Sequence, residues 1–261
     1  MNIQSASSCW SSYPYKKAIK NLLTQKTVEP LIGVLSTNHV QLCPQHSDYL
    51  SDELIEFFMQ TYKYTQFRLH SDVRLKNKKG YTIDLSDFNE ETKPYFKELA
   101  RMSKKMKAPV YSLHAGKRLI SLNELKNKYA RLQDIFEDCT VAVEVLYPFK
   151  NNHWLLDKWQ EYEWLLNNDI KFALDLSHAY IVEQRYGKND DLVNTMIASP
   201  LCTEIHISFN DGKMDSHYLA TDEHNTKYKS YLEQIKNKQE HCVVFSEGNQ
   251  VLHQKKLAKT L

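Results

Sequence analysis

The feature that most constrains this chain is a repeat in which short runs of β-branched and aromatic residues alternate with amphipathic segments along its whole length. This alternation is typical of βα units built around a parallel sheet. We count eight units, and eight such units predict an α/β fold, a single (β/α)8 TIM barrel. No linker rich in Pro, Gly or Ser interrupts the series, so we expect one domain over residues 1–261.

The repeat also places the individual elements. The expected strands cover residues 3–7, 29–37, 65–72, 109–116, 140–148, 170–178, 203–211 and 241–249. The expected helices cover residues 15–25, 51–62, 90–106, 121–136, 152–168, 190–197, 226–237 and 254–261. Several of these helices open on Ser, Asp or Asn, the residues that cap helix N-termini.

Composition excludes several classes of protein. The formal charge of +2 is too balanced to indicate binding to nucleic acid or to an anionic membrane. The apolar runs are shorter than the ~18 residues that a membrane span needs, and the start MNIQSASS lacks the features of a signal peptide. Five cysteines without CxxC spacing argue against a disulfide framework. We therefore expect a cytoplasmic protein with no membrane partner.

Acidic and histidine residues gather where the expected strands end. The acids follow apolar runs, as in VAVE, FALD and VVFSE. The strand candidates are His70, His114, Glu144, Asp175, His178, His206 and Glu247, and Asp215 and His217 follow in the loop after the seventh strand. Because the carboxyl ends of barrel strands converge on one mouth, we expect these nine side chains to share a cavity.

Bound metal is the simplest reason for this concentration of ligands. Several carboxylates buried near one another are costly without a counter-charge, which divalent cations would supply. Imidazole and carboxylate together suit Zn, Mn or Fe. Nine ligands exceed what one ion with four to six sites can use, so we predict two or three ions per chain. In DSH, Asp215 and His217 would point the same way if that part of the loop is extended.

These motifs resemble those of the endonuclease IV branch of the xylose-isomerase-like TIM barrels. SLHAG is similar to that family's fourth-strand motif, VAVEV to its fifth-strand glutamate, and LDLSHAY to its Asp-x-x-His-Ala. IHISFND with MDSH resembles its seventh-strand histidine and following loop, FSEG its closing glutamate, and FRLHSD its third-strand histidine. The likeness is to motifs spread over nearly the whole chain, and no run resembles the family's DNA-penetrating loop.

The resemblance implies a site of three metals, preferably Zn. It places His70 and His114 on the first ion, Asp175, His206 and Glu247 on the second, and His178, Asp215 and His217 on the third. Glu144 would bridge two ions, and Glu247 would also orient water, so these two glutamates are the predicted catalytic residues. The implied reaction is hydrolysis of a phosphoester or phosphodiester by a metal-activated hydroxide.

Substrate and reaction stay open at the level of the sequence. The predicted substrate is a phosphoester, either damaged DNA or a small sugar phosphate, and the sequence does not tell whether there is a protein partner. We expect Lys117, Arg118, Tyr147 and Lys213 to contact it from the loops above the barrel. The first alternative is a sugar or sugar-phosphate isomerase or epimerase with a single Mn or Mg. The second is a multi-iron oxygenase that modifies a peptide.

Overall fold

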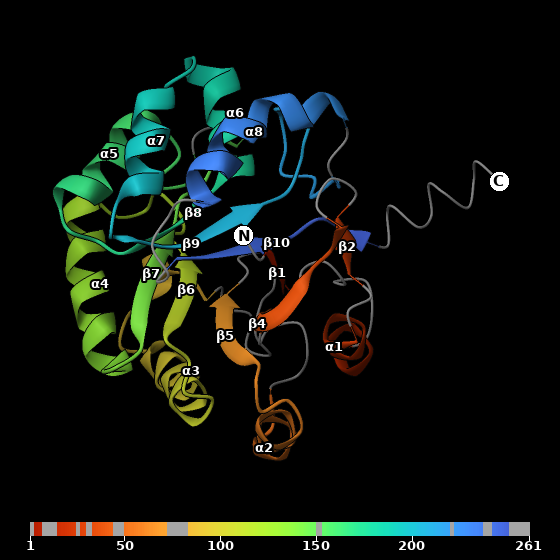
Figure 1. Cartoon of the computed structure of the whole chain (residues 1–261). Coiled ribbons are helices and arrows are strands. Elements are labelled where there is room, and N and C mark those ends of the chain that lie inside the picture. Colours follow the sequence, from red (N-terminus) through yellow and green to blue (C-terminus); the bar gives the residue numbers. More distant parts are fainter. Residues whose placement is uncertain are drawn as a thin grey trace.

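A closed barrel of eight parallel strands forms the centre of the molecule (Figure 1). This computed structural model describes residues 3–6, 15–24, 27–29, 33–43, 50–71, 83–149, 153–219, 222–236 and 242–250. The barrel strands are β1 (Ile3–Ala6), β4 (Ser36–Leu42), β5 (Gln66–Ser71), β6 (Val110–His114), β7 (Thr140–Glu144), β8 (Phe172–Asp175), β9 (Cys202–Ile207) and β10 (Val243–Ser246). They follow one another around the barrel in chain order, and β10 pairs with β1. The predicted (β/α)8 barrel is confirmed.

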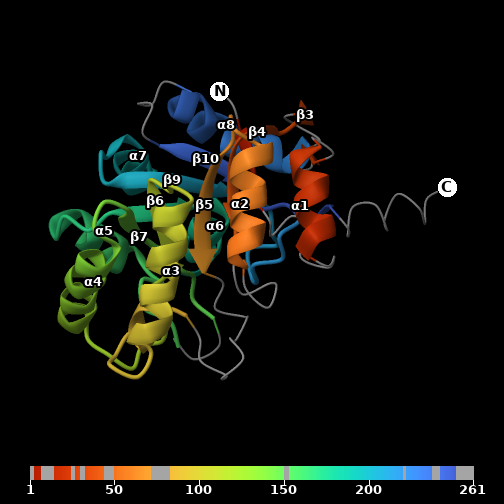
Figure 2. The ribbon, with the colours of Figure 1, turned by 90° about the horizontal axis from the view of Figure 1, so that it is seen from below.

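Helices surround the strands on the outside (Figures 1 and 2). They are α1 (Tyr15–Leu23), α2 (Asp52–Thr61), α3 (Lys93–Lys105), α4 (Leu122–Phe136), α5 (Trp159–Asn167), α6 (Leu176–Tyr186), α7 (Asp190–Ala198) and α8 (Asp222–Lys236), with a short 3-10 turn, η3, at Leu85–Asp87. Among the described residues, no helix has both the length and the apolarity required to cross a membrane.

The second barrel strand lies later in the chain than expected. The predicted strand 29–37 overlaps β4 by only two residues, and its earlier part contains a separate antiparallel pair, β2 (Val28–Glu29) and β3 (Gly33–Val34). The strand was predicted at the apolar run LIGVL because apolar runs indicate buried strands, whereas β4 has the polar sequence STNHVQL. Part of that polarity faces the barrel interior, because the Gln41 side chain reaches residues of β9.

Three helix predictions need comment. The helix predicted over 152–168 begins only at Trp159, because the preceding residues form a loop that bridges to Lys117. Helix α6 was not predicted, since it starts immediately after β8 and leaves no turn residues to mark the boundary. The predicted helix 254–261 lies outside the described residues.

Alternation along the strands separates a helix-packed side from a barrel interior. On β5, Phe67 stacks on Phe58 of α2 at a ring distance of 5.5 Å. On β6, Tyr111 stacks on Phe136 of α4 at 4.4 Å. Side chains one position further along therefore point inward. On β5 the inward side chains include His70, and the polar residues of the site reach the interior by this same alternation.

Candidate metal centre

Six barrel strands each place one candidate ligand at their carboxyl end. These are His70 on β5, His114 on β6, Glu144 on β7, Asp175 on β8, His206 on β9 and Glu247 directly after β10. Strand register holds them level, because His114 pairs with Glu144 and Asp175 pairs with His206 across neighbouring strands. All six are buried. The structure brings these six side chains together at one mouth, as predicted.

Glu144 stands at the centre of the cluster. Its Oε2 atom lies 3.2 Å from Nε2 of His70 and 3.2 Å from Nε2 of His114. Its Oε1 atom lies 3.5 Å from Nδ1 of His206 and 3.6 Å from Nδ1 of His178. One carboxylate thus presents its two oxygens to two different sets of imidazoles, which is the arrangement that a bridging ligand needs.

Two groups bring their ligand atoms close enough to share an ion. His70, His114 and Glu144 form one, and Glu144, Asp175 and His206 form the other; within each group these atoms lie within 4.8 Å of one another. Glu247 extends the second group, with its Oε1 atom 3.9 Å from Nδ1 of His206. Glu144 belongs to both groups.

Several ligand atoms of these groups make no hydrogen bond within the described part of the chain, although they are buried. They are Oε2 of Glu144, Oδ2 of Asp175 and Nδ1 of His206. A buried polar atom without a partner costs about 1–3 kcal/mol, more when it is charged. Three such atoms facing one another form a donor set with the mixture of nitrogen and oxygen that Zn, Mn and Fe accept. The residues present fit a divalent metal.

The third predicted trio forms a chain of contacts beside these groups. Nε2 of His178 lies 3.5 Å from Oδ2 of Asp215 and 3.6 Å from Oδ2 of Asp175. Nε2 of His217 lies 2.7 Å from the same Asp215 oxygen, and its Nδ1 lies 3.8 Å from Oε2 of Glu247. The structure thus brings all nine predicted ligands into one connected cluster.

His178 reaches the cluster from a helix, and its predicted place on the sixth strand is wrong. Asp175 is the N-cap of α6, and its Oδ1 atom accepts hydrogen bonds from the backbone N–H groups of Ser177 and His178. This leaves Oδ2 of Asp175 for the mouth. Nδ1 of His178 lies 2.8 Å from the backbone oxygen of Val145. When Nδ1 carries the proton it donates to this oxygen, and Nε2 on the other side of the ring faces Asp215.

The loop after β9 is closed at its base, and the residue just before that closure has a left-handed backbone. Backbone hydrogen bonds join Phe209 to Tyr218 in both directions. The side-chain amide of Asn210 donates to the backbone oxygen of Ser177 and so ties the loop to α6. His217 has a φ of 47°, so the DSH segment is not extended. Asp215 and His217 meet through this left-handed turn instead of through strand-like spacing.

The environment separates the pKa values of the two predicted catalytic glutamates. Burial opposes ionisation of Glu144, but the charges of His114, His206 and His70 outweigh it and hold its pKa well below the ordinary value. Burial raises the pKa of Glu247 despite the nearby His206 and His217. In this cluster Glu144 is the anion, and Glu247 is the carboxyl that more readily holds a proton.

The four predicted substrate residues differ in their surroundings. The Tyr147 ring lies 4.7 Å from the imidazole of His178, which places it against the cluster. Lys117 and Lys213 are exposed, and Lys213 belongs to the same loop as Asp215. The Arg118 guanidinium lies 2.7 Å from Asp157 and 2.7 Å from Glu161, so it already has two carboxylate partners. Substrate contact by these four residues stays a prediction.

Sequence reasoning missed a set of polar residues directly beneath the mouth. The set comprises Gln41, Arg68, Ser112 and Glu204, all buried inside the barrel. Three of them precede predicted ligands by two positions, in RLH, SLH and EIH, and would therefore face the same way on a strand. A polar residue two positions before an inward histidine was the signal that could have found them.

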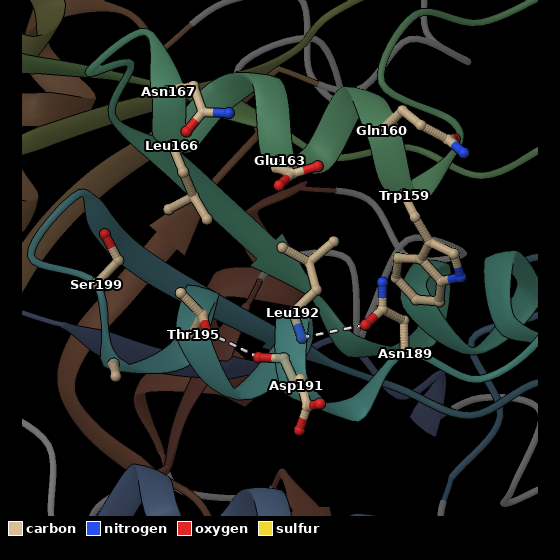
Figure 3. A pocket seen from close by; sticks show the side chains of 11 residues that line it. Trp159, Gln160, Glu163, Leu166, Asn167, Asn189, Asp191, Leu192, Thr195 and Ser199 are labelled. Atoms are coloured by element: carbon tan, nitrogen blue, oxygen red, sulfur yellow. Dashed lines mark hydrogen bonds between the residues drawn. The ribbon is translucent and has the colours of Figure 1, made fainter.

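A separate groove of about 790 Å³ lies on the outer ring of helices, between α5 and α7 (Figure 3). It is lined by residues such as Trp159, Glu163, Leu192 and Thr195, and its lining includes none of the nine candidate ligands. The Asn189 side chain accepts a hydrogen bond from the backbone of Leu192, as a helix cap does. The candidate chemistry therefore belongs to the mouth of the barrel and not to this groove.

Comparison with solved structures agrees with this architecture. D-psicose 3-epimerase, solved in the presence of D-fructose, superposes with a TM-score of 0.65 and 13% identity, covering 94% of this chain and 84% of that chain. IolI protein with a bound zinc atom gives a TM-score of 0.60 and 14% identity, covering 97% and 91%. This chain shares the barrel fold of these proteins.

Endonuclease IV from Thermus thermophilus shares the fold as well, with a TM-score of 0.55 and 14% identity over 85% of this chain and 90% of that chain. The predicted resemblance is confirmed for the barrel fold, which these proteins share with this chain. No family model and no curated protein matches the sequence. Since neighbours with this barrel include both epimerases and a nuclease, the fold does not select the reaction.

Proposed function

We propose that this protein is a divalent-metal-dependent hydrolase of phosphoesters. The observation that carries the proposal is the connected cluster of nine buried or nearly buried imidazoles and carboxylates, in which Glu144 faces two separate ligand groups. A bound divalent cation supplies a Lewis acid that lowers the pKa of water and stabilises charge on phosphoryl oxygens.

Each part of the cluster has a role in this proposal. His70 and His114 would hold one ion, and Asp175, His206 and Glu247 a second, with Glu144 shared between them. Glu247 would also orient the attacking water, because its raised pKa suits a carboxyl that exchanges a proton.

The trio of His178, Asp215 and His217 favours hydrolysis over isomerisation. It adds a third set of ligands in contact with the other two, through Asp175 on one side and Glu247 on the other. A phosphoryl group has enough oxygens to engage several cations, whereas a one-metal isomerase has no use for this trio.

The second candidate function is epimerisation or isomerisation of a sugar or sugar phosphate. The specific observation in its favour is the Tyr147 ring, which packs against His178 at the edge of the cluster and suits the apolar face of a small sugar. In that reaction Glu144 and Glu247 would move protons on opposite sides of the substrate, with a single Mn or Mg.

The deciding experiment combines metal analysis with the double substitution Asp215→Ala and His217→Ala. A hydrolase should contain close to three Zn per chain, and the double variant should lose one of them together with most activity on a model phosphodiester. One Mn per chain with ketose epimerase activity would select the alternative, and tightly held, coloured Fe would select an oxygenase.

Asp211→Asn is the matched control for that variant. Asp211 lies in the same loop but is exposed, and its Oδ1 atom accepts from the backbone of Lys213 and Met214, as an asparagine oxygen also can. It should keep full metal content and activity. A double variant with unaltered metal content would refute the third site. Steep loss of substrate affinity between about 50 and 200 mM salt would identify DNA over a small phosphate.

A further inference from the structure

The barrel interior directly beneath the candidate metal centre is polar. TIM barrels commonly fill this layer with Val, Ile and Leu. Here the layer contains Gln41, Arg68, Ser112 and Glu204, each no more than 3% exposed. Replacing a buried ion pair by apolar residues is often neutral or stabilising, so stability alone does not account for these residues.

Glu204 is the acceptor at the centre of this layer. Its Oε1 atom lies 3.0 Å from Nη1 of Arg68. Its Oε2 atom lies 3.2 Å from the side-chain nitrogen of Gln41 and 3.3 Å from Nε2 of His206. The Arg68 guanidinium and the Gln41 side-chain nitrogen can only donate, so both oxygens of Glu204 accept hydrogen bonds.

This acceptor determines which way the His206 ring faces. With Nε2 directed at Glu204, the opposite nitrogen, Nδ1, is directed at the mouth, 3.5 Å from Glu144 and 3.9 Å from Glu247. Nε2 also lies 3.0 Å from the side-chain nitrogen of Gln41, which donates to the same Glu204 oxygen. Glu204 is the acceptor between these two nitrogens, so a proton on Nε2 of His206 is donated to it, and the lone pair of Nδ1 is then available to a ligand in the mouth.

The same carboxylate reaches a second candidate ligand through Ser112. Nδ1 of His70 lies 3.0 Å from the Ser112 hydroxyl, and the Ser112 side chain also interacts with Glu204. A Ser112 hydroxyl that donates toward the carboxylate accepts from His70. His70 then carries its proton on Nδ1, and its Nε2 faces Glu144 at 3.2 Å.

We infer that Glu204 is a positioning residue that fixes the ring orientation and the protonated nitrogen of His206 directly and of His70 through Ser112. These histidines belong to the two different ligand groups that share Glu144, so one buried carboxylate orients a ligand in each. The inference rests on the proposed metal centre for its purpose, but its geometry is a property of the chain itself.

The first test measures imidazole protons in the metal-free protein, with ¹⁵N-labelled histidine and NMR. The wild type should show hydrogen-bonded N–H groups at Nε2 of His206 and at Nδ1 of His70. Ser112→Ala should remove the His70 signal alone. Glu204→Gln should disturb both, because one amide oxygen replaces two carboxylate oxygens while the surrounding donors stay.

The second test measures Zn²⁺ affinity by competition with a chelator. Loss of a group that orients a ligand histidine weakens metal affinity by about 10- to 100-fold, and we expect this for Glu204→Gln. Glu161→Gln is the matched control, since Glu161 is also a buried carboxylate paired with an arginine, Arg118, and that pair lies outside the ligand cluster. It should leave Zn²⁺ affinity and both imidazole signals unchanged.

A variant that leaves Arg68 buried without a partner can fail to fold. The double substitution Arg68→Met and Glu204→Leu removes both charges and keeps the layer filled, and it should give the same loss of affinity and of the His206 signal. The inference is overturned if this folded double variant keeps the His206 Nε2–H signal or binds Zn²⁺ as tightly as Glu161→Gln. If the imidazole signals behave as expected but the wild type binds no metal, the proposed function fails and the positioning role stands.

Discussion

Two buried clusters of carboxylates in this molecule balance their charge in opposite ways. Asp157 and Glu161 share the Arg118 guanidinium, which bonds to each at 2.7 Å. Glu144, Asp175 and Glu247 at the mouth form no ion pair with Lys or Arg among the described residues, and their charged neighbours are histidines. One cluster thus carries a permanent cation, and the other depends on imidazole or on a cation that binds.

The difference also shows in how completely the oxygens are used. Oε2 of Glu161 accepts from the backbone of Leu156 and Asp157 as well as from Arg118. Oε2 of Glu144 is flanked by two imidazoles at 3.2 Å and makes no hydrogen bond to any residue that the structure describes. Glu161 thus holds loops together, although Oδ2 of Asp157 beside it makes no hydrogen bond among the described residues. The mouth instead places three such atoms next to one another, as a ligand site requires.

The largest effect that tests this comparison is the response of stability to metal. Zn²⁺ at about 100 times its dissociation constant should raise the free energy of unfolding by about 2.7 kcal/mol. Glu144→Gln should abolish most of this gain, because it weakens both ligand groups at once. Urea unfolding with Zn²⁺ and with a chelator measures it.

The Arg118 cluster is the internal reference for that measurement. Glu161→Gln should unfold more easily but should gain as much from Zn²⁺ as the wild type does. Equal stability of the wild type in Zn²⁺ and in chelator would contradict the comparison, since both clusters would then be complete without metal.

The sequence predicted the mouth better than the parts that support it. Glu144, Asp175 and Glu247 could be found because each acid stands at the end of an apolar strand, where an unpaired charge is conspicuous. The partners of Arg118 could not be found, because they lie 39 and 43 positions further along and meet it only after the barrel closes.

The strands could be predicted for the same reason, because apolar runs mark them. The prediction was wrong where a strand lacks such a run. Strands that carry several apolar residues were placed to within a few residues, as for β6 and β7. β4 was displaced because Gln41 faces inward toward Glu204, so the strand lacks an apolar run. The prediction therefore missed the polar layer beneath the mouth, and it also misplaced β4, the strand that contributes Gln41 to this layer.

An effect of intermediate size is the pH dependence of the stability that the Arg118 cluster contributes. Burial opposes ionisation of Glu161, but the hydrogen bond and charge of Arg118 outweigh it and lower its pKa below 4.5. A lowered pKa in the folded state contributes stability that is complete above 4.5 and is lost as the pH falls through the folded value. Glu161→Gln should therefore cost about 2 kcal/mol at neutral pH, the scale of a hydrogen bond to a charged group, and progressively less in acid.

Urea titrations of the wild type and the variant between neutral and acidic pH measure this convergence. The comparison requires the two stability curves to approach each other below pH 4.5, because a protonated Glu161 resembles the amide. A constant gap down to the acid limit would mean that the Arg118 pair does not stabilise the fold through its charge.

The smallest effect concerns Arg118→Lys, which keeps the charge but loses the fork that reaches Asp157 and Glu161 together. Because Lys keeps the charge and part of the pairing, this substitution should cost about 1 kcal/mol in urea unfolding, less than Glu161→Gln. Because the guanidinium is occupied by these two carboxylates, KM for the phosphoester should stay as in the wild type. A tenfold rise in KM with unchanged stability would reverse the assignment: Arg118 would then bind substrate, as its loop position above the barrel predicts, and its cluster would belong to the site.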